Sequence, residues 1–398
     1  MTGPQVFPNL VVPLTDIKTQ STVTMDILRL IFPSWTSENV EITSLKGGIT
    51  NCLLKCVYQA GTTQEKTVLV RAYGRGTGTI IDRNREFCTH IHLHSHGLAP
   101  PLYARFKNGL VYGFIPGRSV EYQELSDPLL MKGIARMLAQ WHTVLDSSSI
   151  RMLMDEQSTT TSKESYAVND IWQLCEKWIN NLPTDTPDQL SRRDVLADEL
   201  QWVKNEIECK GGPTVIAHCD LLSGNVVVPL DWTSGAKSSG MVPPVTFIDY
   251  EYALPSPRAF DLANHFMEWQ GFECDISRIP EVGGPIMRLW VREYLEGVKS
   301  FSKAVYTNGH SKDSRVSQHK TDTGAAVMEK DIDNTVSEVS AWWGMPGFYW
   351  GIWATIQAII STIDFDYSTY AENRLSEYWD WKKSYLASKN DISVTGSP

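Results

Sequence analysis

The chain has 398 residues, of which 42% are hydrophobic and 21% charged, a balance typical of a globular protein rather than a disordered polymer. Its formal net charge of −10 argues against a surface built to bind nucleic acid, because phosphate contacts need clustered lysine and arginine. The seven cysteines form no CxxC pair, which favours a reducing, cytoplasmic location. The N-terminus lacks the pattern of a signal peptide, and the most apolar stretch, residues 348–363, is shorter than the roughly 20 residues that span a bilayer.

The first third of the chain carries strand patterns. Residues 39–59 alternate around a Gly-Gly pair and residues 66–74 are rich in β-branched side chains, so we expect adjacent antiparallel strands. Residues 79–97 predict a helix closed by Gly97. Residues 102–117 predict two more strands with a turn at Asn108-Gly109.

Helical spacing dominates after residue 116. Residues 127–145 predict a helix with Asp127 as its N-cap and Pro128 at its first position. The last third of the chain is also helical in pattern. Two polar stretches, 230–244 between short strands and 303–333, indicate inserts, and the second is expected to be mobile. The expected division is an N-terminal tail (1–22), an N-lobe (23–116) and a helical C-lobe (117–388, with the 303–333 insert).

A short polar loop carries the clearest chemical signal. The stretch AHCDLLSGN places His218, Asp220 and Asn225 directly after an apolar run, and FIDYEY brings Asp249 and Glu251 about two dozen residues later. Any one of these residues alone would be an ordinary turn former or helix cap. Together they fit phosphoryl transfer, with Asp220 accepting the hydroxyl proton and Asn225 and Asp249 binding Mg²⁺. Glu251 is a further candidate metal ligand, because alternate strand residues share a face.

Several ordered motifs extend this pattern over residues 45 to 385: GGITN, VLVRAYG, DRNRE, HCDLLSGNVV, FIDYEYA, FDLANHFMEW and WGIWATIQAIISTIDFDYSTYA. In this order the chain resembles the choline/ethanolamine kinase family. The resemblance implies an α+β, two-lobed protein-kinase-like fold with a small antiparallel-sheet N-lobe and a large helical C-lobe. It also implies ATP and Mg²⁺ as cofactors.

The resemblance assigns roles to further residues. The turn that covers the ATP phosphates would be formed by GGITN, with Gly47, Gly48, Thr50 and Asn51. Arg71 would replace the usual kinase lysine and pair with Glu86 on the following helix. Asp261 would hold the catalytic loop, and His218 would have a structural rather than a proton-shuttling role.

The amino-alcohol substrate would lie between Asp220, Glu268 and a set of rings. The rings that match family positions are Tyr252, Trp350, Trp353, Phe365 and Tyr370. Aromatic residues at helical spacing more often fill a core, and this interpretation is given to Trp342, Trp343, Trp379 and Trp381. The position a few residues after Glu268 that is aromatic in choline kinases falls in the stretch GFE here, which predicts a less complete aromatic cage.

The motif D-L-L-x-x-N, with Leu222 where choline kinases typically carry glutamine, favours ethanolamine as the substrate. The expected activity is ATP-dependent phosphorylation of ethanolamine, the first step of the CDP-ethanolamine route to phosphatidylethanolamine. Alternatives are a choline or dual kinase, a catalytically silent scaffold, and an aminoglycoside phosphotransferase. The expected partner is a small molecule, without nucleic acid or a transmembrane segment, and a homodimer is a candidate assembly.

The stretch HIHLHSH is a competing signal. His90 and His94, like His92 and His96, stand four residues apart on a predicted helix, a spacing that can bind a metal. With no third ligand nearby, a packing or surface role is the preferred interpretation.

Overall fold

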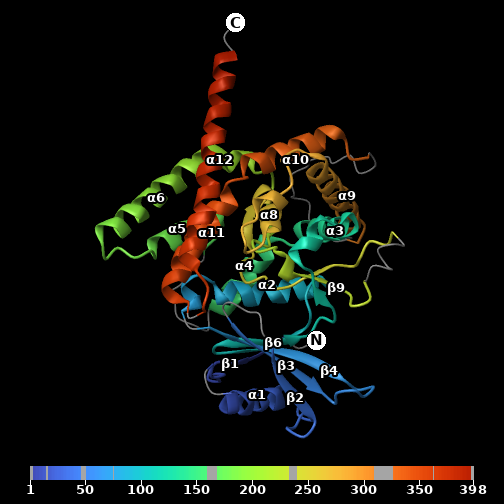
Figure 1. Ribbon diagram of the computed structural model, residues 1–398. Helices are drawn as coiled ribbons and strands as arrows, with labels where there is room; N and C mark the ends of the chain where they lie inside the picture. The colour runs from blue at the N-terminus through green and yellow to red at the C-terminus, as the bar shows by residue number, and fades with distance from the viewer. Residues whose placement is uncertain are drawn as a thin grey trace. The chain divides into compact units, whose positions relative to one another are not determined.

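The computed structural model describes residues 3–14, 17–45, 51–74, 76–158, 168–232, 240–308, 326–361 and 363–395. The chain forms two compact units. The first comprises Met1–Pro116 and Ile360–Asp364, and the second comprises Gly117–Ile359 and Phe365–Pro398 (Figure 1).

The first unit is built on a six-stranded sheet. In spatial order its strands are β1 (Gln5–Phe7), β5 (Leu102–Phe106), β6 (Gly109–Gly113), β4 (Lys66–Tyr73), β3 (Asn51–Tyr58) and β2 (Val40–Leu45). The prediction of antiparallel strands is confirmed for β2 to β6, whereas β1 pairs with β5 in parallel. Strand β1 comes from the segment expected to be a tail; three residues are too few for a strand pattern to be recognised.

The hairpin between β5 and β6 is displaced by one residue from the predicted turn. Phe106 pairs with Gly109, so Lys107 and Asn108 form the turn and Gly109 begins the strand. The side chain of Asn108 accepts a hydrogen bond from Val12 N at 3.0 Å and donates one to Val12 O at 2.9 Å. The turn thereby fixes the N-terminal segment against the sheet.

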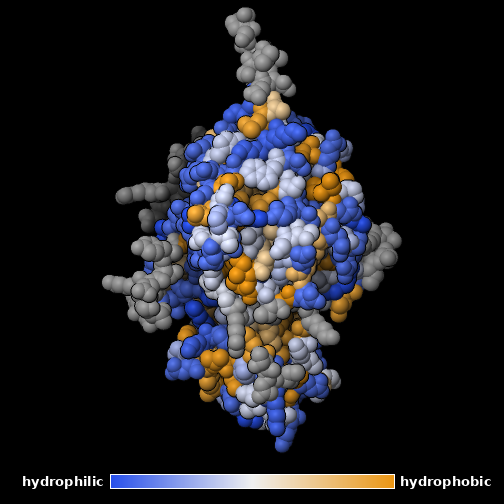
Figure 2. All heavy atoms as spheres, turned by 60° about the vertical axis from the view of Figure 1, so that its left-hand side comes forward, coloured by the Kyte–Doolittle hydropathy of each residue, from blue (hydrophilic) through white to orange (hydrophobic). Residues whose placement is uncertain are grey.

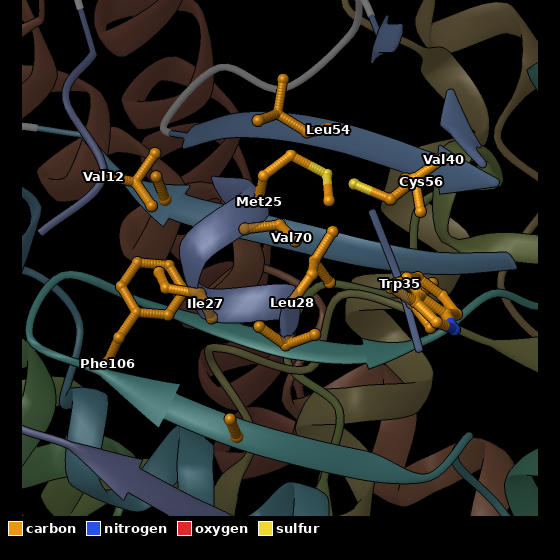
Figure 3. Close-up of a cluster of buried hydrophobic side chains, with 14 residues drawn as sticks. Val12, Met25, Ile27, Leu28, Trp35, Val40, Leu54, Cys56, Val70 and Phe106 are labelled. Carbon is orange, nitrogen blue, oxygen red and sulfur yellow. The ribbon is translucent and has the colours of Figure 1, made fainter. Parts of the chain in front are cut away.

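Helix α1 (Ile17–Ile31) supplies one side of the core of this unit. Figure 3 shows Met25, Ile27 and Leu28 of this helix facing strand residues such as Leu54 and Val70. All five side chains are buried, so apolar burial holds the helix on the sheet.

Helix α2 (Arg83–Ser95) is closed before Gly97 as predicted, but it begins at Arg83 rather than at residue 79. Asp82 caps the N-terminus by accepting hydrogen bonds from two backbone amides, and Gly97 follows the C-terminus with a φ of 72°. Within it, the ring of His90 contacts Pro100 O at 3.0 Å, and burial lowers the pKa of His90 to about 4. The packing role is thus confirmed for His90, and no group of three or more candidate metal ligands occurs in the described residues.

The second unit is mainly helical. Its helices are α3 (Pro128–Val144), α4 (Ser147–Ser158), α5 (Ile171–Asn180), α6 (Pro187–Ile207), α8 (Arg258–Met267), α9 (Pro285–Asn308), α10 (Glu329–Ala341), α11 (Met345–Ile360) and α12 (Tyr367–Thr395). Asp127 caps α3 and Pro128 opens it, as predicted. The ends of the expected insert 303–333 belong to α9 and α10, and residues 309–325 lie outside the described residues.

Short strands in the second unit frame the polar loop. A two-stranded ladder joins β8 (Thr214–Ala217) to β11 (Leu254–Pro257). A three-stranded sheet joins β7 (Arg118–Ser119), β9 (Val226–Val228) and β10 (Thr246–Phe247). The loop between β8 and β9 is therefore anchored at both ends by strands.

Helices α11 and α12 pack closely. A Cβ at Gly347 would lie 2.5 Å from Arg374 O, and one at Gly351 would lie 2.6 Å from the side chain of Leu375. Glycine at these positions lets the two backbones approach, which sets the position of Arg374.

The surface in the view of Figure 2 is largely hydrophilic, with small apolar patches between polar regions. None of the helices among the described residues is both long and apolar enough to cross a lipid bilayer.

Candidate active site

The loop after β8 is held by a single carboxylate. Asp261, in the first turn of α8, accepts hydrogen bonds from the backbone amides of His218 at 2.8 Å and Cys219 at 2.9 Å. Cys219 has a φ of 65°, a left-handed conformation that costs about 1–3 kcal/mol for a non-glycine residue. The carboxylate stabilises this strained backbone, and the predicted role of Asp261 is confirmed.

Asp261 is itself oriented by a buried chain of hydrogen bonds. Its Oδ2 lies 3.0 Å from His142 Nε2, and His142 Nδ1 lies 2.9 Å from the hydroxyl of Tyr294. Burial alone would raise the pKa of Asp261, but the contact with His142 and the backbone amides outweigh it and lower the pKa. The carboxylate is therefore ionised and available to the loop.

Two more residues of α8 bind the same loop. Asn264 donates to Cys219 O at 3.2 Å, and the ring of His265 contacts Leu221 O at 2.9 Å. These residues follow Asp261 by three and four positions, so they lie on one helical face. The sequence analysis did not assign them, although polar residues at this spacing within the apolar stretch FDLANHF are a detectable signal.

His218 is a structural residue of the loop. Its Nε2 lies 3.0 Å from Ile248 O, and burial lowers the pKa of His218 to about 4. The ring is neutral near pH 7 and links the loop to the segment that carries Asp249. This geometry agrees with the predicted structural role.

Asp220 and Asn225 lie together in the loop. Asn225 Nδ2 donates to Asp220 O at 2.7 Å and to Asp220 Oδ2 at 3.1 Å, and Ile248 N donates to Asn225 O at 3.0 Å. Burial raises the pKa of Asp220 well above its usual value, and the charges of Asp249, Glu268 and, less strongly, Glu251 add to this. The loop thus presents a carboxylate of increased basicity.

The protein supplies some of the oxygen ligands that Mg²⁺ requires. Asn225 uses its amide nitrogen on Asp220, which leaves the amide oxygen as the atom that could bind a metal. Asp249 has a φ of 60°, a conformation common at ligand-binding positions. The described residues form no cage of three or more acidic, histidine or cysteine ligands, and Mg²⁺ in nucleotide enzymes takes its remaining ligands from phosphates and water. The donor set fits this ion.

The candidate nucleotide-binding residues belong to the first unit. Arg71 of β4 lies 3.6 Å from Glu86 of α2, so the expected ion pair is present, and Arg83 approaches the other oxygen of Glu86 at 3.0 Å. Gly47, Gly48 and Thr50 lie outside the described residues, and Asn51 opens β3, with its side chain outside the description.

Three predicted substrate-binding rings lie together in the second unit. Trp353 Nε1 donates to the hydroxyl of Tyr252 at 2.8 Å, and the ring of Trp350 stands edge to face with both, at 5.7 Å from Tyr252 and 5.3 Å from Trp353. Trp350 Nε1 also donates to Asn264 Oδ1 at 2.8 Å. The rings are therefore fixed to the helix that holds the catalytic loop.

Phe365 and Tyr370 extend this group, with ring centroids 5.7 Å apart. Tyr367, which the sequence analysis did not assign, connects Phe365 to Trp353. Phe272 lies 6.2 Å from Phe365 and 6.3 Å from Tyr370. The expectation of a less complete aromatic cage is wrong, because Phe272 of the GFE stretch reaches this aromatic cluster from the loop after α8.

Glu268 follows α8 directly and is 7% exposed. Its Oε1 lies 3.7 Å from Arg374 Nη2, on α12. Burial raises the pKa of Glu268, the positive charge of Arg374 opposes this, and the charge of Glu377 adds to it. The sequence analysis assigned neither Arg374 nor Glu377, since a charged pair on a long helix is usually solvent-exposed.

Comparison with known proteins places this geometry in context. The family model for choline/ethanolamine kinase matches residues 42–379. The chain belongs to the choline/ethanolamine kinase family. This membership agrees with the resemblance given by the motifs and with the kinase-like arrangement of Asp220, Asn225 and Asp249.

Named relatives of this family member include mouse and rat proteins. The chain is 30% identical to ethanolamine kinase 1 of Mus musculus over 92% of its own length and 90% of that protein. It is 31% identical to ethanolamine kinase 2 of Rattus norvegicus over 91% and 81% of the two chains.

Solved structures share the fold. An ethanolamine kinase of Plasmodium vivax aligns with a TM-score of 0.70 and 25% identity, over 93% of this chain and 90% of that one. A choline kinase of Cryptosporidium parvum aligns with a TM-score of 0.63 and 17% identity, over 93% and 97%, and shows the shared fold alone.

In this family member, the tryptophans assigned to the core differ in burial. Trp342 is fully buried and donates to Ile207 O at 3.0 Å, as a core residue would. Trp379 is 37% exposed and lies beside Lys382. The core interpretation is therefore confirmed for Trp342 and wrong for Trp379, which is exposed.

Proposed function

We propose that this chain transfers the γ-phosphoryl group of Mg·ATP to the hydroxyl of ethanolamine, giving phosphoethanolamine and ADP. The observation that carries the proposal is that helix α8 joins two buried carboxylates, because Asp261 of α8 holds the loop that carries Asp220 and Glu268 follows α8 directly. A small amino alcohol has a hydroxyl and an ammonium two carbons apart. One molecule can therefore offer its hydroxyl to Asp220 and its ammonium to Glu268.

Each residue of the site has a separate task. Asp220 orients the hydroxyl and accepts its proton, for which its raised pKa is suited. Asn225 and Asp249, with Glu251 as a further candidate, would hold Mg²⁺. When bound, this ion neutralises the charge that develops on the phosphates. The pair of Arg71 and Glu86, together with Gly47, Gly48, Thr50 and Asn51, would bind ATP.

The acceptor preference follows from the chemistry of the ammonium. A primary ammonium has three N–H donors, which Glu268 can accept, whereas quaternary choline has none. The rings of Tyr252, Trp350, Trp353, Phe365 and Tyr370 suit either cation, since ring faces attract any positive charge. Relatives that are named ethanolamine kinases support ethanolamine as the main substrate. Choline as a second substrate is the alternative that the aromatic cluster favours.

Two other functions are less well supported. A silent scaffold would need a broken catalytic site, and Asp220, Asn225 and Asp249 are all in place. An aminoglycoside phosphotransferase would need a site for a large sugar, whereas the aromatic cluster beside Glu268 suits a small cation.

We also assign the enzyme to the cytoplasm, because all seven cysteines are free thiols. The binding partner that we expect there is the small amino-alcohol substrate. The proposed homodimer can be tested by the molar mass in solution.

The first experiment measures ADP release with Mg·ATP and, in parallel, ethanolamine, choline or no acceptor. We expect kcat/KM for ethanolamine to exceed that for choline. Asp220→Ala and Asp249→Ala should each lower kcat at least a thousandfold while leaving the circular dichroism spectrum unchanged. Retention of a tenth of the wild-type kcat in either variant would falsify its assigned role. The absence of acceptor-dependent ADP release with both ethanolamine and choline would favour the scaffold.

A further inference from the structure

Arg374 is a fully buried arginine whose guanidinium lies between two carboxylates. Its Nη2 is 3.7 Å from Glu268 Oε1, and its Nη1, at the other end of the group, is 3.5 Å from Glu377 Oε2. Glu377 lies one turn after Arg374 on α12, and its side chain is 12% exposed. Glu268, Arg374 and Glu377 form what we call the charge cluster, with two negative charges and one positive charge.

The charge cluster contains unsatisfied polar atoms. Among the described residues, Glu268 Oε1, Glu377 Oε2 and the three guanidinium nitrogens of Arg374 have no hydrogen-bond partner. Buried charged groups without hydrogen bonds are costly, so a native protein rarely keeps them without a functional reason. A primary ammonium would supply both the missing positive charge and N–H donors for Glu268.

The guanidinium of Arg374 carries one positive charge, so it cannot neutralise both carboxylates. If Glu377 were absent, Arg374 would be the full counterion of Glu268 and would compete with a substrate cation. With Glu377 present, the positive charge is shared between two acids, and one net negative charge remains in the charge cluster. The close packing of α12 on Gly347 keeps this arrangement in place, since the backbone of Arg374 lies against that glycine.

We propose that Glu377 is a positioning residue that sets the affinity of the site for the ammonium of the acceptor. It shares the positive charge of Arg374, so that the charge cluster keeps one net negative charge for the substrate ammonium, while Arg374 orients the carboxylate of Glu268. This inference rests on the proposed function, because it takes an amino alcohol as the ligand of Glu268. Glu377 contacts no reacting atom and acts only through its two neighbours.

The test begins with Glu377→Gln, which removes the charge and keeps the size of the side chain. We expect KM for ethanolamine to rise at least fivefold, while kcat and KM for ATP stay within about twofold. The dissociation constant for ethanolamine, measured from tryptophan fluorescence without ATP, should rise by the same factor. Glu377→Asp keeps the charge and should bind ethanolamine more tightly than Glu377→Gln. Unchanged ethanolamine affinity in Glu377→Gln overturns the proposal.

A double variant separates charge from packing. Arg374→Met combined with Glu377→Gln leaves Glu268 as the one charge of the cluster, which restores the net charge of the native site. We expect ethanolamine KM to return toward the native value from that of Glu377→Gln. If the double variant folds and its ethanolamine KM does not recover, the charge-balance argument is contradicted. If the double variant does not fold, the comparison of Glu377→Asp with Glu377→Gln tests the argument instead.

A matched control uses another arginine–carboxylate pair of the same unit. Arg258 Nε lies 2.7 Å from Glu338 Oε2, and Glu338→Gln should leave ethanolamine KM unchanged. If the native protein phosphorylates no amino alcohol, the proposed function fails, yet the fluorescence titration still tests the inference. If it phosphorylates ethanolamine and Glu377→Gln behaves like the native protein, the inference alone fails.

Discussion

The two ends of helix α8 differ in how their carboxylates are satisfied. At the first turn, Asp261 receives two backbone amides and the ring of His142, all within 3.0 Å. Just beyond the last turn, Glu268 has one ion contact at 3.7 Å, and its Oε1 has no hydrogen-bond partner among the described residues. The same helix thus fixes the catalytic loop completely and leaves the other carboxylate with unused bonding capacity.

This contrast separates two requirements of a phosphotransferase. Groups that stabilise a transition state act best when they need no rearrangement during the reaction. A group that binds the acceptor gains affinity when the ligand completes its bonding, because an unsatisfied buried carboxylate is unfavourable without the ligand. The catalytic end should therefore control kcat, and the acceptor end should control KM.

The largest expected effect comes from breaking the catalytic end with Asp261→Asn. Asparagine keeps one carbonyl oxygen but directs N–H donors at the second backbone amide, which is itself a donor, so the loop would lose one of its two anchoring hydrogen bonds. We expect kcat to fall at least 100-fold, with ethanolamine KM changed less than about threefold. The free energy of unfolding should fall by about 2–3 kcal/mol, as measured by urea denaturation.

A matched control for that variant is Glu293→Gln, which removes a buried charge paired with Lys132 and Arg136 elsewhere in the same unit. It should reduce stability without a comparable loss of kcat. A mainly KM-based defect in Asp261→Asn would contradict the assignment of Asp261 to the catalytic end.

A smaller effect is expected at the acceptor end from Trp350→Phe. This change removes the hydrogen bond to Asn264 and weakens the ring contact with Tyr252. With a loss of about 1 kcal/mol in cation binding, KM should rise about fivefold for ethanolamine and for choline. Trp342→Phe loses an equivalent indole hydrogen bond in the core and should change stability alone. Equal KM values in the two variants would remove Trp350 from the acceptor site.

The smallest expected effect is a shift in pH dependence. Asp220 must be ionised to accept a proton, so kcat/KM rises with pH through its raised pKa and levels off above it. Glu251→Gln removes one negative charge that contributes to the raised pKa of Asp220. The acidic limb should move to lower pH by less than about one unit, as measured by ADP release from pH 5 to 9. Glu281→Gln, an exposed control, should leave it in place, and movement to higher pH would contradict the role of Asp220 as the base.

The catalytic end could be predicted from the sequence because its residues are close together in the chain. Asp220 and Asn225 share one loop, and Asp249 follows the next strand of the same small sheet. Polar residues after buried strands are visible in a pattern of hydrophobic and polar letters. Local motifs and periodicity were also sufficient for helix α3, with its cap at Asp127, and for the end of α2 before Gly97.

The acceptor end was harder to predict because it depends on packing between distant helices. Arg374 reaches Glu268 because α12 lies against glycines of α11, and no local pattern reports such an approach. Phe272 reaches Tyr370 from a loop whose path the sequence does not specify. Arg374 is also buried between two acids, whereas charged residues are generally exposed and are therefore assigned to the surface when only the sequence is used.

The pairing of β1 with β5 has a consequence for the behaviour of the protein in solution. Strand β5 would be the edge of the sheet if residues 5–7 were removed, and the contacts of Val12 with Asn108 would be lost together with the segment 1–14. An exposed edge offers unpaired backbone groups to a second chain and promotes aggregation. The N-terminal segment therefore protects the sheet from intermolecular strand pairing, and proteolytic trimming there should lower solubility.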